Sequence, residues 1–186
     1  KEAAKYNIKV LLGFHYSDFW ADPAVQLLPK AWEKDRNNQE KMCSNVYEFT
    51  KETLEQFKDA GADIGMVQVG NEISQGMMGI MQRTKANVWQ EEEKSVLIDS
   101  YLNAGARAVR ECVPDALVAI HLDTLNLSIY KDAMNAWERD KVDYDVLGSS
   151  SYAFWAGKNM LGNVRKAGNY VASRGKLFAV LETSWL

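Results

Sequence analysis

Two glutamates in this chain stand at positions that suit acid–base chemistry. Glu72 ends the segment Met66–Glu72, and Glu182 ends the segment Leu177–Glu182. Valine-rich apolar runs of this length, bounded by turn residues, are typical of strands buried on both faces. A carboxylate at the end of such a strand lies at a loop rim. Two of them are what a glycosidase needs on either side of a sugar–oxygen bond, one as acid and one as nucleophile or base.

Five predicted strands alternate with helices and would position these carboxylates. The strands are expected at Ile8–Phe14, Ile64–Val69, Leu117–His121, Tyr144–Gly148 and Leu177–Leu181. Alternation of this kind indicates parallel pairing with right-handed crossovers. Two α/β architectures fit it: an open doubly wound sheet, or part of a (β/α)8 TIM barrel. The first strand lacks the G-x-G-x-x-G turn of the doubly wound class, and polar or aromatic residues follow every strand, which favours the barrel.

The helices of the pattern follow from capping residues and apolar spacing. Asn45 with Glu48 three residues later predicts an N-cap and capping-box partner, and Gly61 suits the C-terminal end of that helix. Its apolar face would comprise Val46, Phe49, Thr53 and Phe57. Further helices are expected over Trp89–Cys112, Ser128–Arg139 and Lys158–Ser173, with a loop over Ile73–Lys85. No linker or change in composition divides residues 1–186, which are interpreted as a single domain.

Polar and aromatic residues after the strands are candidates for binding a sugar. Asn71 could bond the 2-hydroxyl of a sugar, a contact that strengthens in the transition state, and Tyr152 could donate a hydrogen bond to Glu182. The full set of candidate binding residues is His15, Tyr16, Asp18, Trp20, Asp22, Asn71, His121, Asp123, Tyr152, Trp155 and Trp185. Each also has a structural alternative: a strand-end ion pair or helix cap for an acid, and a core or rim position for an aromatic ring.

The amino-acid composition limits the kinds of molecule that this chain is expected to bind. The chain has 186 residues and a net charge of −3, with 22 basic and 25 acidic residues and no basic stripe, which excludes nucleic acid and anionic membranes as expected partners. No apolar stretch approaches the ~20 residues of a membrane span. Cys43 and Cys112 could pair in a secreted protein, and the favoured alternative is that they are two unpaired, buried residues. A zinc site from His15, His121 and an acid is a weaker interpretation, so no metal or cofactor is predicted.

The segment Val10–Pro23, followed by Lys30-Ala31-Trp32, resembles glycoside hydrolase family 53, the endo-β-1,4-galactanases. Val67–Ile73 is similar to the acid/base segment of that family, and Leu181–Ser184 to its nucleophile segment. The resemblance implies a retaining enzyme acting on β-1,4-galactan side chains of pectin, with Glu72 as acid/base and Glu182 as nucleophile. It also implies that the five strands are the third to seventh of the barrel, so that residues 1–186 form one catalytic domain lacking both ends of the barrel.

Several positions depart from the family pattern. Gly13 stands where the family commonly has Asp, Gly79-Ile80 where it often has Trp-Pro, and Ala153 where it usually has Pro. Ser184-Trp185 replaces a more usual Ala-Tyr. Two alternatives therefore stay open: another β-1,4-glycanase such as a mannanase or cellulase, and a non-catalytic galactan-binding barrel fragment. Secretion or cell-surface attachment is expected from the polymeric substrate, and the oligomeric state is left open.

Overall fold

The computed structural model describes residues 1–82 and 87–184, without the side chains at 155, 156 and 158. Five strands form one sheet in the order β1-β2-β5-β6-β7, and every neighbouring pair is parallel. Their bounds are β1 Val10–Phe14, β2 Ile64–Val69, β5 Leu117–Leu122, β6 Val146–Ser150 and β7 Leu177–Glu182. A short antiparallel hairpin is formed by β3 Gly76–Met77 and β4 Ile80–Met81.

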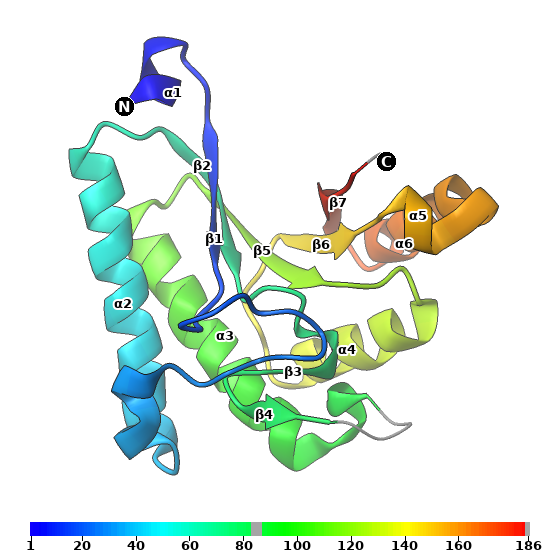
Figure 1. Ribbon diagram of the computed structural model, residues 1–186, viewed down its shortest axis with the longest axis horizontal. Coiled ribbons are helices and arrows are strands. Elements are labelled where there is room, and N and C mark those ends of the chain that lie inside the picture. Colours follow the sequence, from blue (N-terminus) through cyan, green and yellow to red (C-terminus); the bar gives the residue numbers. More distant parts are fainter. Residues whose placement is uncertain (83–86, 185–186) are drawn as a thin grey trace.

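Long helices follow the strands and pack beside one another in chain order (Figure 1). The α-helices are α1 Glu2–Lys5, α2 Gln39–Asp59, α3 Glu92–Cys112, α4 Leu127–Arg139, α5 Ala153–Ala156 and α6 Met160–Ser173. The 3-10 turns are η1 Lys30–Asp35, η2 Ile73–Gln75, η3 Val88–Gln90 and η4 Gly157–Asn159. A doubly wound sheet reverses its strand order at a switch point, whereas a barrel does not. Because the sheet follows chain order throughout, the predicted α/β barrel architecture is confirmed, with five strands described.

The pleat of the strands separates a packed face from a polar one. Val67 and Val69 of β2 are fully buried in the hydrophobic core, and Val69 lies against Gly105 of α3. Successive side chains of a strand point to opposite faces, so Gln68 faces away from the helices. Burial of each large aliphatic side chain in this core stabilises the fold by about 1.5–3 kcal/mol. The helix layer thus fixes the strands while their other face is free to carry polar groups.

The first long helix begins earlier than its sequence indicates. Its N-cap is Asn38, whose side chain accepts a hydrogen bond from the Lys41 amide, so the predicted cap at Asn45 is wrong. Asn45 lies inside the helix and donates to Asp35 instead. The buried face consists of Met42, Val46, Thr50 and Leu54. Of the predicted face only Val46 is fully buried, because Phe49 and Phe57 belong to a second stripe at the same spacing and stay half exposed.

Other element boundaries shift for local reasons. The fourth strand covers Val146–Ser150 and not Tyr144–Gly148, because its last residues are serines that look like loop. The helix expected over Trp89–Cys112 is divided into η3 and α3, and the one over Lys158–Ser173 begins at Met160 after α5 and η4. The loop expected over Ile73–Lys85 contains η2 and the β3–β4 hairpin, and its residues 83–85 lie outside the described part of the chain.

Two expectations from composition can be compared with the structure. Cys43 is half-buried and Cys112 is buried, and neither forms a disulfide. Within residues 1–82 and 87–184, none of the helices combines the length and apolar character needed to cross a membrane.

Candidate active site

The carboxyl ends of β2 and β7 bring the two predicted glutamates together. Gly70 and Glu72 both adopt left-handed backbone conformations, with φ of 84° and 51°. Such a conformation costs a non-glycine residue of order 1–3 kcal/mol and is found mostly where function demands it. One carboxylate oxygen of Glu72, one of Glu182 and one ring nitrogen of His121 lie within 4.8 Å of one another. Two acids from distant parts of the chain therefore converge at one edge of the sheet.

Glu72 occupies an environment that disfavours its charge. Its Oε1 is 2.5 Å from the Ser150 hydroxyl, which projects from the end of β6. Burial raises the pKa of Glu72 above its usual range, the hydrogen bond from Ser150 offsets part of that rise, and the negative charges of Glu182, Asp123 and Asp22 add to it. The carboxyl group is thus suited to carrying a proton at a pH where an ordinary glutamate has lost it.

The carboxylate of Glu182 is oriented by a hydrogen bond from the side chain of Tyr152. The Tyr152 hydroxyl donates to Glu182 Oε2 at 2.7 Å, which confirms the predicted contact. This hydrogen bond to a carboxylate, with burial, raises the pKa of Tyr152 to about 12, so the phenol stays a donor near neutral pH. Ser150 is the register partner of Glu182 in the adjacent strand, which fixes the position of the Glu182 backbone. The Glu182 carboxylate is thus held in a fixed orientation. Its side chain is 36% exposed and therefore accessible to an incoming group.

His121 lies fully buried between the two acids. Its Nδ1 is 3.1 Å from Asn71 Oδ1 and 3.8 Å from Glu182 Oε1, and its Nε2 is 3.0 Å from Ser150 Oγ. Burial lowers the pKa of His121 to about 4, so the ring is neutral near pH 7. Among the described residues, Glu72, His121 and Glu182 form the one group that could hold a metal ion. Both ring nitrogens are already engaged by protein partners, so this donor set fits a hydrogen-bond network better than a metal.

Asn71 belongs to the buried support of the site. It is 4% exposed, its Nδ2 donates to Ala21 O at 2.8 Å, and its Oδ1 accepts from Gln68 Nε2 at 2.8 Å. Gln26 Nε2 donates to Asn71 O at 2.8 Å from the loop after β1. These contacts hold the peptide before Glu72 in place. Gln68 and Gln26 were not predicted as site residues, because a single glutamine in a strand or loop belongs to no recognisable sequence pattern.

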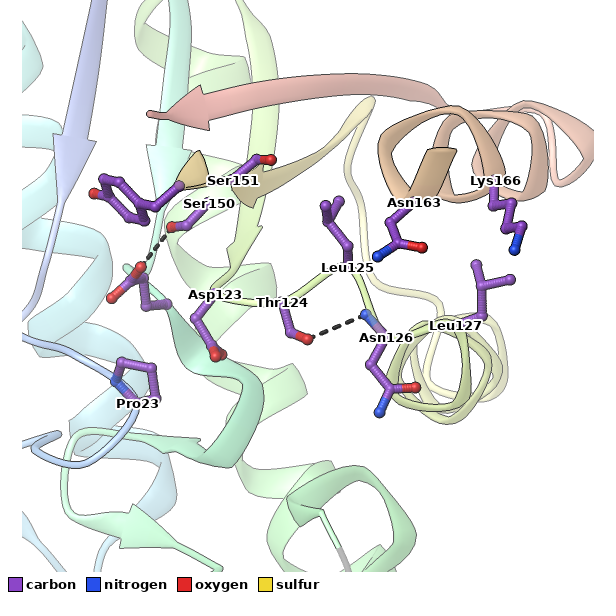
Figure 2. Close-up of a pocket in the computed structure, with 12 residues that line it drawn as sticks. Pro23, Asp123, Thr124, Leu125, Asn126, Leu127, Ser150, Ser151, Asn163 and Lys166 are labelled. Atoms are coloured by element: carbon purple, nitrogen blue, oxygen red, sulfur yellow. Dashed lines mark hydrogen bonds between the residues drawn. The ribbon is translucent and has the colours of Figure 1, made fainter. Parts of the chain in front are cut away.

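A pocket of about 770 Å³ opens beside Glu72 and Tyr152. Figure 2 shows Ser150 and Asp123 on one side of it, and Asn163 and Lys166 projecting from α6 toward Leu125 and Leu127 on the other. Burial raises the pKa of Asp123 above its usual range. Glu182 is not among the lining residues and contacts the pocket through Tyr152. The lining residues that the sequence did not single out are Thr124, Leu125, Asn126, Leu127, Ser150, Asn163 and Lys166.

The segment after β1 contributes less to this pocket than predicted. Tyr16 is a correction: it is 3% exposed and its hydroxyl is 2.8 Å from Thr50 Oγ1 of α2, so it belongs to the core. Its left-handed backbone, with φ of 49°, accompanies this inward placement. Asp18 accepts from the Lys30 amide and organises the loop, and Trp20 is 85% exposed and outside the pocket lining. None of these three side chains lines the pocket beside Glu72.

The remaining predicted positions divide into three kinds. His15 lies in a separate groove of about 410 Å³, with Trp32 and Phe49, and its Nδ1 accepts from the Ala21 amide. Asp22 accepts from the Ala24 and Val25 amides at the turn that leads to Pro23, close enough for its charge to act on Glu72. Trp185 lies outside the described residues, as does the side chain of Trp155.

Comparison with known proteins gives consistent results. The family model "Glycosyl hydrolase family 53" matches residues 1–186. The chain is 39% identical to an endo-beta-1,4-galactanase of Bacillus subtilis over 188 residues, which is 100% of this chain and 40% of that protein. It is 32% identical to an arabinogalactan endo-beta-1,4-galactanase of Humicola insolens, covering 100% of this chain and 55% of that protein. The GH53 catalytic domain of Ignisphaera aggregans superposes with a TM-score of 0.84 at 28% identity, over 99% of this chain and 48% of that one. The chain thus spans about half the length of these relatives.

Proposed function

Because the chain belongs to glycosyl hydrolase family 53, we propose that the protein hydrolyses β-1,4-galactosidic bonds within galactan chains and retains the anomeric configuration. The relatives named above are endo-β-1,4-galactanases, and Glu72 and Glu182 converge here with Ser150, His121 and Tyr152 beside them. The proposed substrate is the galactan and arabinogalactan side chains of pectin.

One observation carries the retaining mechanism: an oxygen of Glu72 lies within 4.8 Å of an oxygen of Glu182. Retaining glycosidases place their two carboxyl groups about 5–5.5 Å apart, whereas inverting enzymes leave about 6.5–9.5 Å for a water molecule. The separation here leaves no room for a water molecule between the second carboxylate, Glu182, and the anomeric carbon. It therefore supports direct attack by one of the two carboxylates.

The environments of the two acids assign their roles. Glu72, whose pKa is raised by burial, protonates the glycosidic oxygen as the bond breaks. Glu182, aimed by Tyr152, attacks the anomeric carbon and forms a glycosyl-enzyme. Glu72 has then become a carboxylate and takes a proton from the water that releases the sugar. The contacts of Glu72 with Ser150 and of Glu182 with Tyr152 support these proposed roles.

The proposed extent and location of the enzyme follow from the same assignment. Residues 1–186 would be part of one catalytic barrel, since five strands in chain order do not close an eight-stranded one. A polymeric substrate has to be met outside the cell, so we propose a secreted or cell-surface protein. Galactanase activity of a culture that produces the protein should then appear in the medium or on intact cells, and activity confined to a cell lysate would contradict this location.

The test uses the full-length protein with galactan, mannan and cellulose side by side. Release of reducing ends from galactan alone is the expected result. Glu182→Ala should abolish turnover while galacto-oligosaccharide binding persists, and Glu52→Ala, at an exposed glutamate of α2, is the matched control with normal activity. Cleavage of mannan or cellulose in preference to galactan would transfer the assignment to another glycanase. Binding of galactan without cleavage by the unmodified protein would indicate a binding function and refute the proposal.

A further inference from the structure

The pocket of about 770 Å³ is asymmetric with respect to the two carboxylates. Glu72 lies in its wall, whereas Glu182 does not and contacts the pocket through Tyr152. In a retaining glycosidase the acid lies beside the leaving oxygen, and the nucleophile attacks the anomeric carbon. The leaving oxygen belongs to the sugar on the reducing-end side of the cleaved bond. A pocket lined by the acid and not by the nucleophile therefore suits the sugars of the leaving group.

The size of the pocket exceeds what a single leaving sugar needs. Pockets of about 300–1,000 Å³ hold drug-sized ligands, and the volume here lies in the upper part of that range. A disaccharide is a ligand of this size. The pocket thus has room for two sugars in a row, one next to the cleaved bond and a second beyond it.

The wall farthest from the acid is formed by the start of α4 and by α6. Leu125 and Leu127, which are partly buried against the core, supply apolar surface. Asn163 and Lys166 are three residues apart and therefore lie on one face of α6. Figure 2 shows both of them projecting from α6 on the side of the pocket opposite Ser150. Apolar surface with a few convergent polar groups is the usual composition of a small-molecule site.

The side chains of Asn163 and Lys166 are free to bind a ligand. Neither has a hydrogen-bond or ion-pair partner within the part of the chain that the structure describes. Lys166 is the one cation among the lining residues, while the acids Glu72 and Asp123 lie at the other end of the pocket. An ammonium group offers three donors, and an amide offers donors and an acceptor. Together they can bind the hydroxyl and ring oxygens of a neutral sugar.

We propose that Asn163 and Lys166 bind the second galactose on the leaving side of the cleaved bond and thereby favour cleavage that releases at least two galactose units. This inference rests on the proposed function, because it takes Glu72 as the acid and galactan as the substrate. A leaving group of one sugar does not extend to α6 and forgoes these contacts. Asn163 and Lys166 are thus specificity residues that influence which bond of the chain is cut.

The experiment measures the choice between two bonds of one substrate by the full-length protein. Galactotetraose with an isotope label in its reducing-end sugar releases labelled galactobiose or labelled galactose, and mass spectrometry of the earliest products gives their ratio. This ratio does not depend on how much of a variant is folded. Lys166→Ala and Asn163→Ala should each lower the proportion of galactobiose to galactose by about 3–10-fold, the size of a lost hydrogen bond.

Two matched variants complete the test. Arg165→Ala removes an exposed cation of the same helix that does not line the pocket, and its ratio should equal that of the unmodified protein. Lys166→Arg keeps a cationic donor and should keep most of the preference for galactobiose.

The possible failures are distinguishable. Cleavage with an unchanged ratio in both alanine variants at the pocket, or an equal fall in Arg165→Ala, would overturn the role of α6 and leave the proposed function standing. No cleavage of galactotetraose by the unmodified protein would refute the proposed function and this role together.

Discussion

Asp99 in α3 is a carboxyl group buried beside a second carboxyl group, that of Asp140. It is 1% exposed, and neither carboxyl oxygen has a hydrogen-bond partner among the described residues. Burial, with the neighbouring carboxyl of Asp140, raises the pKa of Asp99 to about 9 from 3.8. The folded protein therefore holds this group as the neutral acid at pH 7, whereas the unfolded chain ionises it.

The magnitude follows from the pKa difference. A group with a folded pKa above its unfolded pKa contributes stability that is complete below about pH 4 and is lost progressively up to about pH 9. At pH 7 the buried Asp99 lowers the free energy of unfolding by about 4 kcal/mol, because each pH unit above 3.8 contributes about 1.4 kcal/mol. Asparagine is neutral in both states and removes this cost. We expect Asp99→Asn to raise the free energy of unfolding by about 2–4 kcal/mol at pH 7.

Urea unfolding of the full-length protein at pH 5, 7 and 8.5 measures this effect. The difference between Asp99→Asn and the unmodified protein should grow with pH and nearly vanish toward pH 4. Asp115→Asn, at an exposed position before β5, is the matched control and should show no such growth. A variant no more stable than the unmodified protein at pH 8.5, or a difference independent of pH, would refute the reasoning.

Three further predictions concern the site. Glu72→Ala should lower kcat/KM on galactan by about 10²–10⁴-fold but leave cleavage of a dinitrophenyl galactobioside, whose leaving group needs no proton, within about tenfold of normal; equal losses on both substrates would argue against the acid role. Because the pKa of Glu72 is raised and its protonated form is the active one, kcat/KM should fall on the alkaline side at a pH above 4.5, and a decline centred at or below 4.5 would contradict this. Tyr152→Phe removes the 2.7 Å hydrogen bond to Glu182 and should reduce kcat by tenfold or more with KM little changed, whereas an unchanged kcat would show that Glu182 is held in position by other contacts.

The strands whose ends bear the site could be predicted because their apolar runs are short and sharply bounded. β2 begins and ends at the predicted residues, Ile64 and Val69. Glu72, Glu182 and Tyr152 were predicted for the same reason, since a polar residue at the end of an apolar strand lies at the rim. The expectation that β7 is buried on both faces is wrong, because Leu177 and Val180 are exposed. How close Glu72 and Glu182 lie depends on where their strands stand in the sheet. That strand order is known only from the structure.

Other features of the site and fold could not be predicted from the sequence. Ser150 ends a strand whose last residues are polar, so this segment resembles a loop in sequence, although the Ser150 side chain lies between Glu72 and His121. Tyr16 stands in the dense polar segment after β1, but its hydroxyl is bonded to Thr50 in the core and it cannot reach the pocket. The helix start at Asn38 was not predicted, because Asn45 also matches the pattern of an N-cap. Spacing alone does not distinguish a capping motif at the start of a helix from the same residues inside a helix.

The stereochemistry of the first product tests the central claim most directly. Proton NMR of galactan oligosaccharides during the first minutes of hydrolysis by the full-length protein distinguishes the two anomers before they equilibrate. Two carboxylates with oxygens within 4.8 Å of each other predict that the β-anomer forms first. Initial formation of the α-anomer would require a water between Glu72 and Glu182, and would contradict the account.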